Sequence, residues 1–598
     1  MLINGDAAAA TKPLSLQPAW WKDGIIIYEV YPASFKDDNG DGIGDLRGLI
    51  AKLPYLKSLG IDAIWLAPHY KSPRLDEGYD ISDYRDIHEP FGTLQDCQEL
   101  IASAHSHRLK ILFDLVINHC SDQHAWFQES RQDKTNPKRD WFYWKPPRYD
   151  EAGVRHPPNN WRSCFGGSVW QWCETTEEYY FHSFLPEQPD LNWGNPEVRQ
   201  AIYRDAVRFW LDRGVDGFRI DCSNMLSKRL DFPDAPVVAP RTPWQPAGDF
   251  LSNGPRLKEF LRELRKENFN HYDCFSIGEL PNTPGLATVL SYISTEAEAL
   301  DAVIQFDHVD LDHNHKEGYP LLKQEWKLSE FKRLAEFAQQ LADPKNKAHA
   351  LTYLENHDQA RSVSRFASDA PEHRLASSKM LATYLLTMSG SVILYQGQEI
   401  GMVNAPKDWD IDTEYKDVGT IATWREMKED SERLNDPSLL ERAREGIQLT
   451  ARDHSRTPMQ WDSSPNAGFS TNADAKPWMR VMDSYREGLN VTEQEEDPNS
   501  TLNFYRKMLA LRKEHKDVFT LGRFDHFDKE NEATMIYTKT AQDGSRAALV
   551  VLNFTAESHS FEVPATLKGK IGQLLFSTVD GEADSPLAAY EARVFLYE

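Results

Sequence analysis

The sequence predicts an α/β protein built on a (β/α)8 TIM barrel, with a small domain inserted after the third strand and an antiparallel β domain at the C-terminus. Short apolar runs typical of buried parallel strands alternate with helix-like segments from Ile25 onward. Eight such strands are expected, the number that a closed barrel requires. Four runs carry carboxylates at or near their C-terminal ends, where these barrels place functional groups: Asp114, Asp221, Glu279 and Asp358.

The first half of the barrel is predicted from a regular alternation of strand and helix. The expected elements are strands at Ile25–Tyr31 and Ala63–Ala67, a third strand in the run ending at His119, and helices at Leu46–Leu59, Leu94–His107 and Pro196–Arg213. Residues 120–191 interrupt this alternation and are rich in Trp, Pro, Gly and Asn. They are too many for a simple loop, so we interpret them as an inserted domain.

The second half of the barrel continues the alternation of strands and helices, and a region of strand-like runs follows it. The expected strands are Gly217–Asp221, Phe275–Glu279, Ala302–Phe306, Leu351–Glu355 and Val392–Tyr395, and the helices include Arg256–Glu267, Leu328–Gln340 and Leu502–His515. The barrel then comprises residues 1–119 and 192–518, with a long insertion at 401–495 after the eighth strand. From Phe519, strand-like runs such as Thr534–Thr538 and Ala547–Phe554 predict a β-sandwich domain over 519–598.

Composition excludes several classes of partner. A formal net charge of -25 over 598 residues argues against binding to nucleic acid or to an anionic membrane, because both need a basic surface. The sequence contains no run of about 20 apolar residues, which is the length needed to span a membrane. Met1–Leu16 does not have the pattern of a signal peptide. Six scattered cysteines without paired spacing predict reduced thiols and a cytoplasmic protein. The sequence does not fix the oligomeric state, and we expect a monomer or a weak homo-oligomer.

The carboxylates that end two adjacent strands indicate glycoside hydrolysis. Two carboxylates suffice for this reaction, and Asp221 and Glu279 are expected to lie close enough for the retaining route. Arg219 points to the same side of its strand as Asp221 and is expected to keep that nucleophile ionised. Glu279 needs a raised pKa to act as an acid, and Asp358 is expected to bind sugar hydroxyls. Any one of these acids alone is equally consistent with a structural ion pair at a strand end.

Two histidines adjoin these strand ends. His119 and His357 each lie beside a carboxylate or an amide in the sequence. A single histidine is more often a hydrogen-bonded structural residue, but here we interpret both as donors to a substrate hydroxyl or to developing charge.

An acidic loop near the N-terminus is the best candidate for a metal site. Its oxygen side chains fall at alternate positions, as in the first part of an EF-hand loop, and the expected ligands are Asp37, Asn39, Asp41, the carbonyl of Ile43, and Asp45. The twelfth position is Gly48 instead of the bidentate Glu, which excludes a complete EF-hand. We expect a partial loop that holds a structural Ca²⁺; the alternative is a turn rich in Asp and Gly. No organic cofactor is indicated.

Taken together, the motifs resemble glycoside hydrolase family 13, the α-amylase family, and within it the α-glucosidase and oligo-1,6-glucosidase group. The resemblance runs from about Trp20 to the C-terminus. The segments that carry it are Asp114–His119, Gly217–Asp221, Ile277–Glu279, Asn356–Asp358, Gln188–Asn192 and Gly390–Met402.

The resemblance implies a role for each site residue. Asp221 would be the nucleophile, Glu279 the general acid and base, and Asp358 the stabiliser of the transition state. The residues implied in substrate binding are His119, Arg219 and His357 around the glucose ring, Asp76 and Arg456 closing its far side, Tyr79 stacking beneath it, and Phe184 lining the site. The metal loop matches the family's loop at the five positions given above.

The expected function is a retaining, exo-acting α-glucosidase that forms a covalent glucosyl-aspartate and acts on short oligosaccharides. In this group Val after the nucleophile accompanies α-1,6 preference and Thr or Ala accompanies α-1,4 preference, but here the residue is Cys222. Because Cys is unbranched and smaller than Val, it favours maltose-type and sucrose-type substrates. The alternatives are an α-1,6-specific isomaltase, or a transglucosidase or sucrose isomerase that uses the same intermediate. A non-catalytic transporter subunit of the same fold would have a membrane anchor and would not need the acids.

Overall fold

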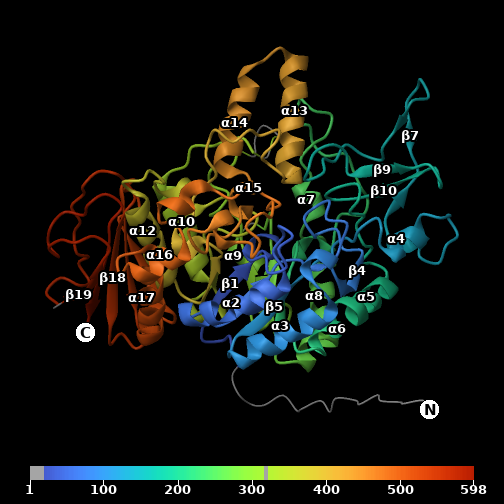
Figure 1. Ribbon diagram of the computed structural model, residues 1–598. Helices are drawn as coiled ribbons and strands as arrows, with labels where there is room; N and C mark the ends of the chain where they lie inside the picture. Colours follow the sequence, from blue (N-terminus) through green and yellow to red (C-terminus); the bar gives the residue numbers. More distant parts are fainter. Residues whose placement is uncertain (1–18, 284, 315–318, 320, 571) are drawn as a thin grey trace.

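The computed structural model describes residues 19–598 except 284, 315–318, 320 and 571. Its centre is a barrel of eight parallel strands in the order β13-β12-β11-β5-β2-β1-β15-β14, which confirms the predicted fold class (Figure 1). The strands are β1 Ile26–Val30, β2 Ala63–Leu66, β5 Lys110–Leu115, β11 Gly217–Ile220, β12 Phe275–Glu279, β13 Ala302–Ile304, β14 Leu351–Thr352 and β15 Ser391–Tyr395. All neighbouring pairs along this order run parallel.

The barrel closes between β13 and β14 through side chains. In the described part of the chain no backbone ladder joins these two strands. Instead, the hydroxyl of Tyr353 donates a hydrogen bond to the carbonyl of Gln305 at 2.9 Å, and an imidazole nitrogen of His308 lies 2.7 Å from the carbonyl of Tyr353. Apolar side chains such as Ile27, Trp65 and Ile277 belong to a buried cluster in the barrel and keep it solid, as is usual for this fold.

Helices surround the barrel as the sequence predicts. The principal ones are α2 Leu46–Leu59, α3 Leu94–Ser106, α5 Pro196–Ile202, α6 Phe209–Leu211, α8 Leu257–Glu267, α9 Leu286–Ile293, α10 Leu328–Gln340, α12 Arg374–Thr387 and α17 Thr501–Glu514. The predicted helix Pro196–Arg213 contains a π-helical segment, Tyr203–Arg208, between α5 and α6. Several predicted strands are also shorter than expected; the third ends at Leu115, not at His119. The residues that leave the strands early supply the loops at the top of the barrel.

The inserted segment forms a separate small layer beside the barrel. It contains helix α4 Ala125–Ser130, the three-stranded sheet of β6 Trp144–Lys145, β10 Glu178–Phe181 and β9 Trp170–Cys173, and the hairpin of β7 Arg148–Tyr149 and β8 Arg155–His156. Its core is aromatic: the rings of Trp161, Trp170 and Phe181 pack with Phe232, which comes from the loop after β11. This packing attaches the insertion to the rim of the barrel.

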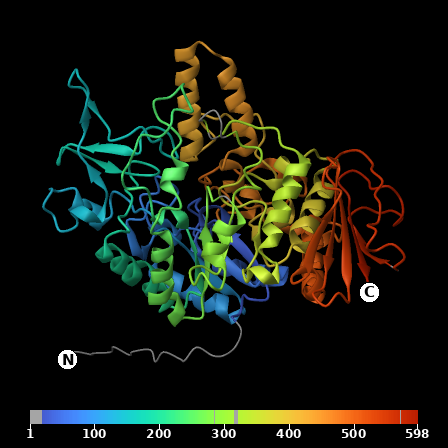
Figure 2. The same cartoon turned by 180° about the vertical axis from the view of Figure 1, so that it is seen from behind.

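The second insertion contains a helical hairpin that projects above the barrel, shown in orange in Figures 1 and 2. Helix α13 Val418–Leu434 ends at Asn435, which adopts the left-handed conformation that permits a tight reversal. Helix α14 Ser438–Thr450 then returns, and the short helix α15 Asp453–Arg456 follows at the top of the barrel. The remainder includes α16 Val491–Glu496.

The C-terminal residues form one five-stranded antiparallel sheet. Its order is β16-β17-β18-β20-β19, with β16 Arg523–Phe527, β17 Thr534–Thr540, β18 Ala547–Asn553, β19 Gly572–Ser577 and β20 Ala592–Tyr597. One face packs on the barrel helices, where the hydroxyls of Tyr537 and Thr387 lie 2.6 Å apart. The other face packs against apolar side chains of loops, among them Leu567 and Leu587. Within the described residues the second layer of the predicted sandwich therefore consists of loops with a single bridge between His559 and Leu587.

The described residues include no helix with both the length and the apolarity needed to cross a membrane.

Candidate active site

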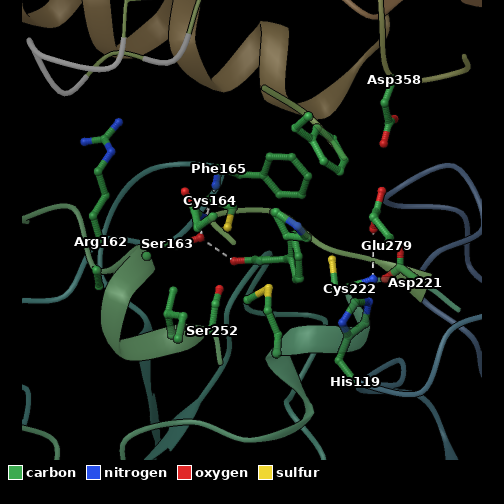
Figure 3. Close-up of a pocket in the computed structure, with 18 of the residues that line it drawn as sticks. His119, Arg162, Ser163, Cys164, Phe165, Asp221, Cys222, Ser252, Glu279 and Asp358 are labelled. Atoms are coloured by element: carbon green, nitrogen blue, oxygen red, sulfur yellow. Dashed lines mark hydrogen bonds between the residues drawn. The ribbon is translucent and has the colours of Figure 1, made fainter. Parts of the chain in front are cut away.

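The acids predicted at separate strand ends meet in one cavity. Asp221 follows β11, Glu279 ends β12, and Asp358 lies beyond β14, so all three occupy the C-terminal face of the barrel. They line a cavity of about 410 Å³ whose wall also contains residues of the inserted segment and of the 401–495 insertion. Figure 3 shows the three carboxylates, with His119 and Cys222, gathered at one end of this cavity.

Asp221 and Glu279 have the spacing of a catalytic carboxylate pair. One ligand oxygen of each carboxylate lies within 4.8 Å of the other and of the Cys222 sulfur. Retaining glycosidases hold their two carboxyl groups roughly 5–5.5 Å apart, whereas inverting enzymes need about 6.5–9.5 Å to admit a water. The guanidinium of Arg219 is 2.9 Å from the Asp221 carboxylate and also binds Glu279. Because this cation already neutralises charge on both carboxylates, the cluster is not suited to binding a metal ion.

The two carboxyl groups differ in their affinity for a proton. Burial raises the pKa of Glu279 to about 7, although Arg219 opposes the shift and the negative charge of Asp221 adds to it. Burial also raises the pKa of Asp221 to about 6, again against Arg219 and with Asp114 adding to it. The sequence predicted that Arg219 keeps Asp221 ionised, and in the structure this guanidinium contacts Asp114 and Glu279 as well as Asp221. Near neutral pH the geometry therefore keeps Asp221 ionised and a proton available on Glu279.

The backbone turns sharply directly after Asp221. Cys222 has φ 42° and ψ 42°, a left-handed conformation that non-glycine residues rarely adopt. This turn directs the Cys222 amide toward the neighbouring strand, where it donates a hydrogen bond of 2.8 Å to Oε2 of Glu279 (Figure 3). The Cys222 side chain lines the cavity beside Met225. Local backbone strain of this kind is common at functional sites, and here it fixes the Glu279 carboxylate relative to Asp221.

Asp358 is held as an anion. Although its burial favours the neutral form, the nearby guanidiniums of Arg452 and Arg456 and the ring of His357 hold its pKa below the usual range. Arg456 donates to Oδ1 at 2.9 Å, and Arg452 lies 3.4 Å from the same atom. A fixed negative charge is thus available in the wall of the cavity.

An aromatic layer forms the floor of this end of the cavity. Tyr79 and His357 stack with ring centres 5.4 Å apart, and the Tyr79 hydroxyl lies 2.5 Å from Nε2 of His357. Glu29 contacts the other nitrogen of His357 at 2.5 Å, while an imidazole nitrogen of His119 lies 3.0 Å from the Tyr79 carbonyl. Burial lowers the pKa of His119 to about 4 and that of His357 to about 3, so both rings are neutral at pH 7.

Asp76 extends the polar wall beyond His119. Its Oδ2 accepts a hydrogen bond of 2.8 Å from Gln188, which is also 3.2 Å from the His119 ring. Its other oxygen, Oδ1, is buried and has no protein partner among the described residues. Phe184 lies 5.0 Å from the His119 ring and completes the wall. A buried carboxylate oxygen that faces a cavity without a donor is suited to a ligand hydroxyl.

Four of the seven predicted substrate residues line the cavity, and the other three lie behind its wall. Arg219 and His357 form the second layer beneath the cavity, and Asp76, Tyr79, His119 and Phe184 line it. Arg456, predicted to pair with Asp76, is 1% exposed and braces Asp358 and Asp417 from behind. Arg452, four residues earlier and one helical turn away, lines the cavity instead. The sequence motif that contains Arg456 identified the correct segment, but it did not show which of the two arginines in that segment faces the cavity.

Further lining residues were missed by the sequence analysis because they belong to the two insertions or to irregular loops. They include Arg162, Ser163, Phe165, Met225, Ser252 and Tyr319. Phe165 was detectable only as one of many aromatic residues in the inserted segment, and Arg162 carries no motif.

The predicted metal loop forms a compact turn of Asp, Asn and Gly residues. Both oxygens of Asp37 accept backbone N–H groups, from Gly40 at 2.6 Å and Gly42 at 2.8 Å. Asp45 caps the N-terminus of α2 through Gly48, and Asn39 and Asp41 each accept one amide two residues ahead. Oδ2 of Asp45 already accepts the amides of Asp38 and Asn39. The side chains of Asp37, Asn39 and Asp41 and the carbonyl of Ile43 are oxygen donors of the kind that a hard cation such as Ca²⁺ prefers.

Comparison with known proteins assigns the chain to a family. The family model for the catalytic domain of alpha amylase matches residues 29–522. The chain belongs to the alpha-amylase family. An "Alpha-glucosidase" of Candida albicans is 44% identical over 580 residues, covering 97% of this chain and 99% of the relative. An "Oligo-1,6-glucosidase" of Saccharomyces cerevisiae is 42% identical over 595 residues, covering 97% of this chain and 98% of the relative.

Solved structures of other enzymes are similar to this chain over their whole length. An isomaltulose synthase variant from Erwinia rhapontici, solved with its substrate sucrose, has a TM-score of 0.88 at 36% identity and covers 98% of this chain and 100% of the other. The family match and the identity to α-glucosidases and oligo-1,6-glucosidases over nearly the full chain show that this protein is a glycoside hydrolase.

Proposed function

We propose that the protein is a retaining, exo-acting α-glucosidase that releases the non-reducing terminal glucose of short oligosaccharides. The observation that carries this proposal is the buried pair of Asp221 and Glu279, within 4.8 Å, at one end of the cavity. That end is surrounded by Asp76, His119 and Asp358, leaving room for a terminal sugar ring rather than for a chain that passes through. The similarity to α-glucosidases and oligo-1,6-glucosidases supports the same activity.

In the first step, Asp221 attacks the anomeric carbon while Glu279 gives its proton to the departing glycosidic oxygen. The raised pKa of Glu279 supplies that proton near neutral pH, and the guanidinium of Arg219 orients the ionised Asp221. The product is a glucosyl ester on Asp221 and an aglycone with a free hydroxyl.

In the second step, Glu279, now a carboxylate, takes a proton from a water that attacks the anomeric carbon, and the ester bond to Asp221 breaks. Two inversions give α-glucose and return Glu279 to its protonated form. Asp358 stays anionic throughout because Arg452 and Arg456 stabilise its charge. Neutral His119 lines the cavity and is placed to contact a ring hydroxyl, while neutral His357 lies beneath the cavity and orients Tyr79.

The position of Cys222 favours maltose-type and sucrose-type linkages. Its side chain lines the cavity directly beside the Asp221–Glu279 pair, where the bond to be cut would lie. Cys lacks the second Cβ substituent of Val, so it leaves more space for an aglycone joined through a ring hydroxyl.

A structural Ca²⁺ in the loop of Asp37, Asn39, Asp41, Ile43 and Asp45 is part of the proposal. Phe469 accepts a backbone hydrogen bond from Asp37, and Trp478 donates one to Gly42, both at 2.9 Å. A cation here would stabilise the junction between the first barrel loop and the segment after α15, without taking part in the reaction.

The test is initial glucose release from maltose, isomaltose and sucrose by the purified protein. Maltose or sucrose well ahead of isomaltose would support the proposal. Isomaltose ahead would overturn the linkage assignment, and new oligosaccharides without net glucose would indicate a transglucosidase or sucrose isomerase.

A further inference from the structure

One face of helix α13 lies over the part of the cavity that is remote from the catalytic acids. Gly419, Thr423, Glu426, Asp430 and Arg433 recur at intervals of three or four residues, so they share one face of the helix. Gly419 and Thr423 line a smaller pocket together with Arg452 and Asp358. This face of α13 is therefore continuous with the wall of the active-site cavity.

Three polar side chains on this face each bind a different loop of the rim. Glu426 forms a bidentate ion pair with Arg162 of the inserted segment, with one contact at 2.8 Å. Asp430 accepts a hydrogen bond from the hydroxyl of Tyr319, in the loop after β13. Arg433 donates to the carbonyl of Arg241, in the loop after β11, at 2.7 Å. Helix α13 thus fastens three loops that are separate in the sequence.

The Arg162–Glu426 pair lies at the end of the cavity opposite the acids. Figure 3 shows Arg162 and Asp221 at opposite sides of the pocket, with Phe165 between them. The Arg162 side chain is 7% exposed and that of Glu426 is 24% exposed, so the pair is largely shielded from water. A Cβ on Gly419 would lie 3.3 Å from the ring of Phe165, which shows how closely this loop packs on α13.

We propose that this clasp, formed by Arg162 and the α13 residues Glu426, Asp430 and Arg433, limits the substrate to about one sugar unit beyond the bond that is cut. The inference rests on the proposed α-glucosidase function and adds its chain-length specificity. A terminal glucose occupies the end with Asp221, and the aglycone extends toward Phe165 and Arg162. A second aglycone sugar then meets a paired, partly buried guanidinium and carboxylate, which give it no room unless the ion pair breaks.

The experiment compares kcat/KM for maltose and maltotriose, with an aryl α-glucoside as a substrate whose aglycone is a single ring. Glu426→Gln and Arg162→Gln are each expected to raise the maltotriose-to-maltose ratio roughly tenfold, equivalent to about 1.4 kcal/mol. Glu432→Gln is the matched control, because Glu432 is exposed on another face of α13 and has no side-chain partner among the described residues. It should leave the ratio unchanged.

A charge exchange distinguishes the clasp from a general effect on folding. The double variant Arg162→Glu with Glu426→Arg is expected to restore the low wild-type ratio, while each single reversal raises it. Activity on the aryl glucoside shows that each variant is folded. If the wild type cleaves maltotriose as well as maltose, or the single variants leave the ratio unchanged, the clasp proposal is wrong and the proposed function stands. If the wild type releases no glucose from any α-glucoside, both proposals are wrong.

Discussion

Replacing Glu279 by Gln is expected to remove the alkaline limb of the pH–rate profile and leave the acid limb. In the wild type, activity requires an ionised Asp221 and a protonated Glu279. As pH falls through the Asp221 pKa of about 6, the nucleophile becomes protonated; as pH rises through the Glu279 pKa of about 7, the acid loses its proton. Gln does not titrate, so the variant should lose only the second transition.

The two pKa values place the optimum of the wild type. The state with Asp221 ionised and Glu279 protonated should be most populated between about pH 6 and about pH 7. The wild-type rate should fall on each side of this range, toward one order of magnitude per pH unit well away from it. The variant should be slower by about 10²–10⁴-fold on substrates with poor leaving groups, and less impaired on activated aryl glucosides.

The assay is kcat/KM from pH 4.5 to 8.5, with maltose for the wild type and one activated aryl α-glucoside for both proteins. Because kcat/KM reports the free enzyme up to formation of the glucosyl ester, the second step does not obscure the result. Thermal unfolding of both proteins at each pH excludes loss of fold as the cause. An alkaline limb that persists in Glu279→Gln, or equal losses on maltose and on the aryl glucoside, would refute the acid role of Glu279.

Three other substitutions test separate parts of the site. Asp221→Asn should lower kcat by about 10⁴-fold or more with unchanged thermal stability, and near-normal turnover would end the proposed mechanism. Cys222→Val should raise isomaltose hydrolysis relative to maltose, since it narrows the cavity beside the acids; an unchanged ratio in competition assays would remove the basis of the linkage assignment. Chelation of calcium should lower Tm by about 2–4 °C in the wild type but not in Asp37→Asn, and equal shifts in both would argue against the proposed loop.

The sequence predicted the barrel and the position of its acids because each depends on a short local pattern. An apolar run such as Phe275–Glu279 becomes a buried strand wherever it lies in the chain, and its terminal carboxylate must then emerge at the C-terminal face. Parallel order places Asp221 beside Glu279 without further information. The caps also follow from local chemistry, as when Asp45 accepts from the amide of Gly48 at the start of α2.

What the sequence did not predict depends on contacts between distant segments. Arg162 and Glu426 are 264 positions apart, and neither belongs to a recognisable pattern. Arg452 and Arg456 differ by one helical turn, so only the packing of α15 decides which one faces the cavity. The left-handed backbone at Cys222 has no local signal in the sequence either, since Cys has no intrinsic preference for positive φ.

The most direct test of the account is the configuration of the glucose first released from maltose, followed by ¹H NMR before mutarotation equilibrates the anomers. The spacing of Asp221 and Glu279, within 4.8 Å, predicts that α-glucose appears first and β-glucose only later by mutarotation. If β-glucose appeared first, a water would have attacked directly, and the covalent role of Asp221 would be contradicted.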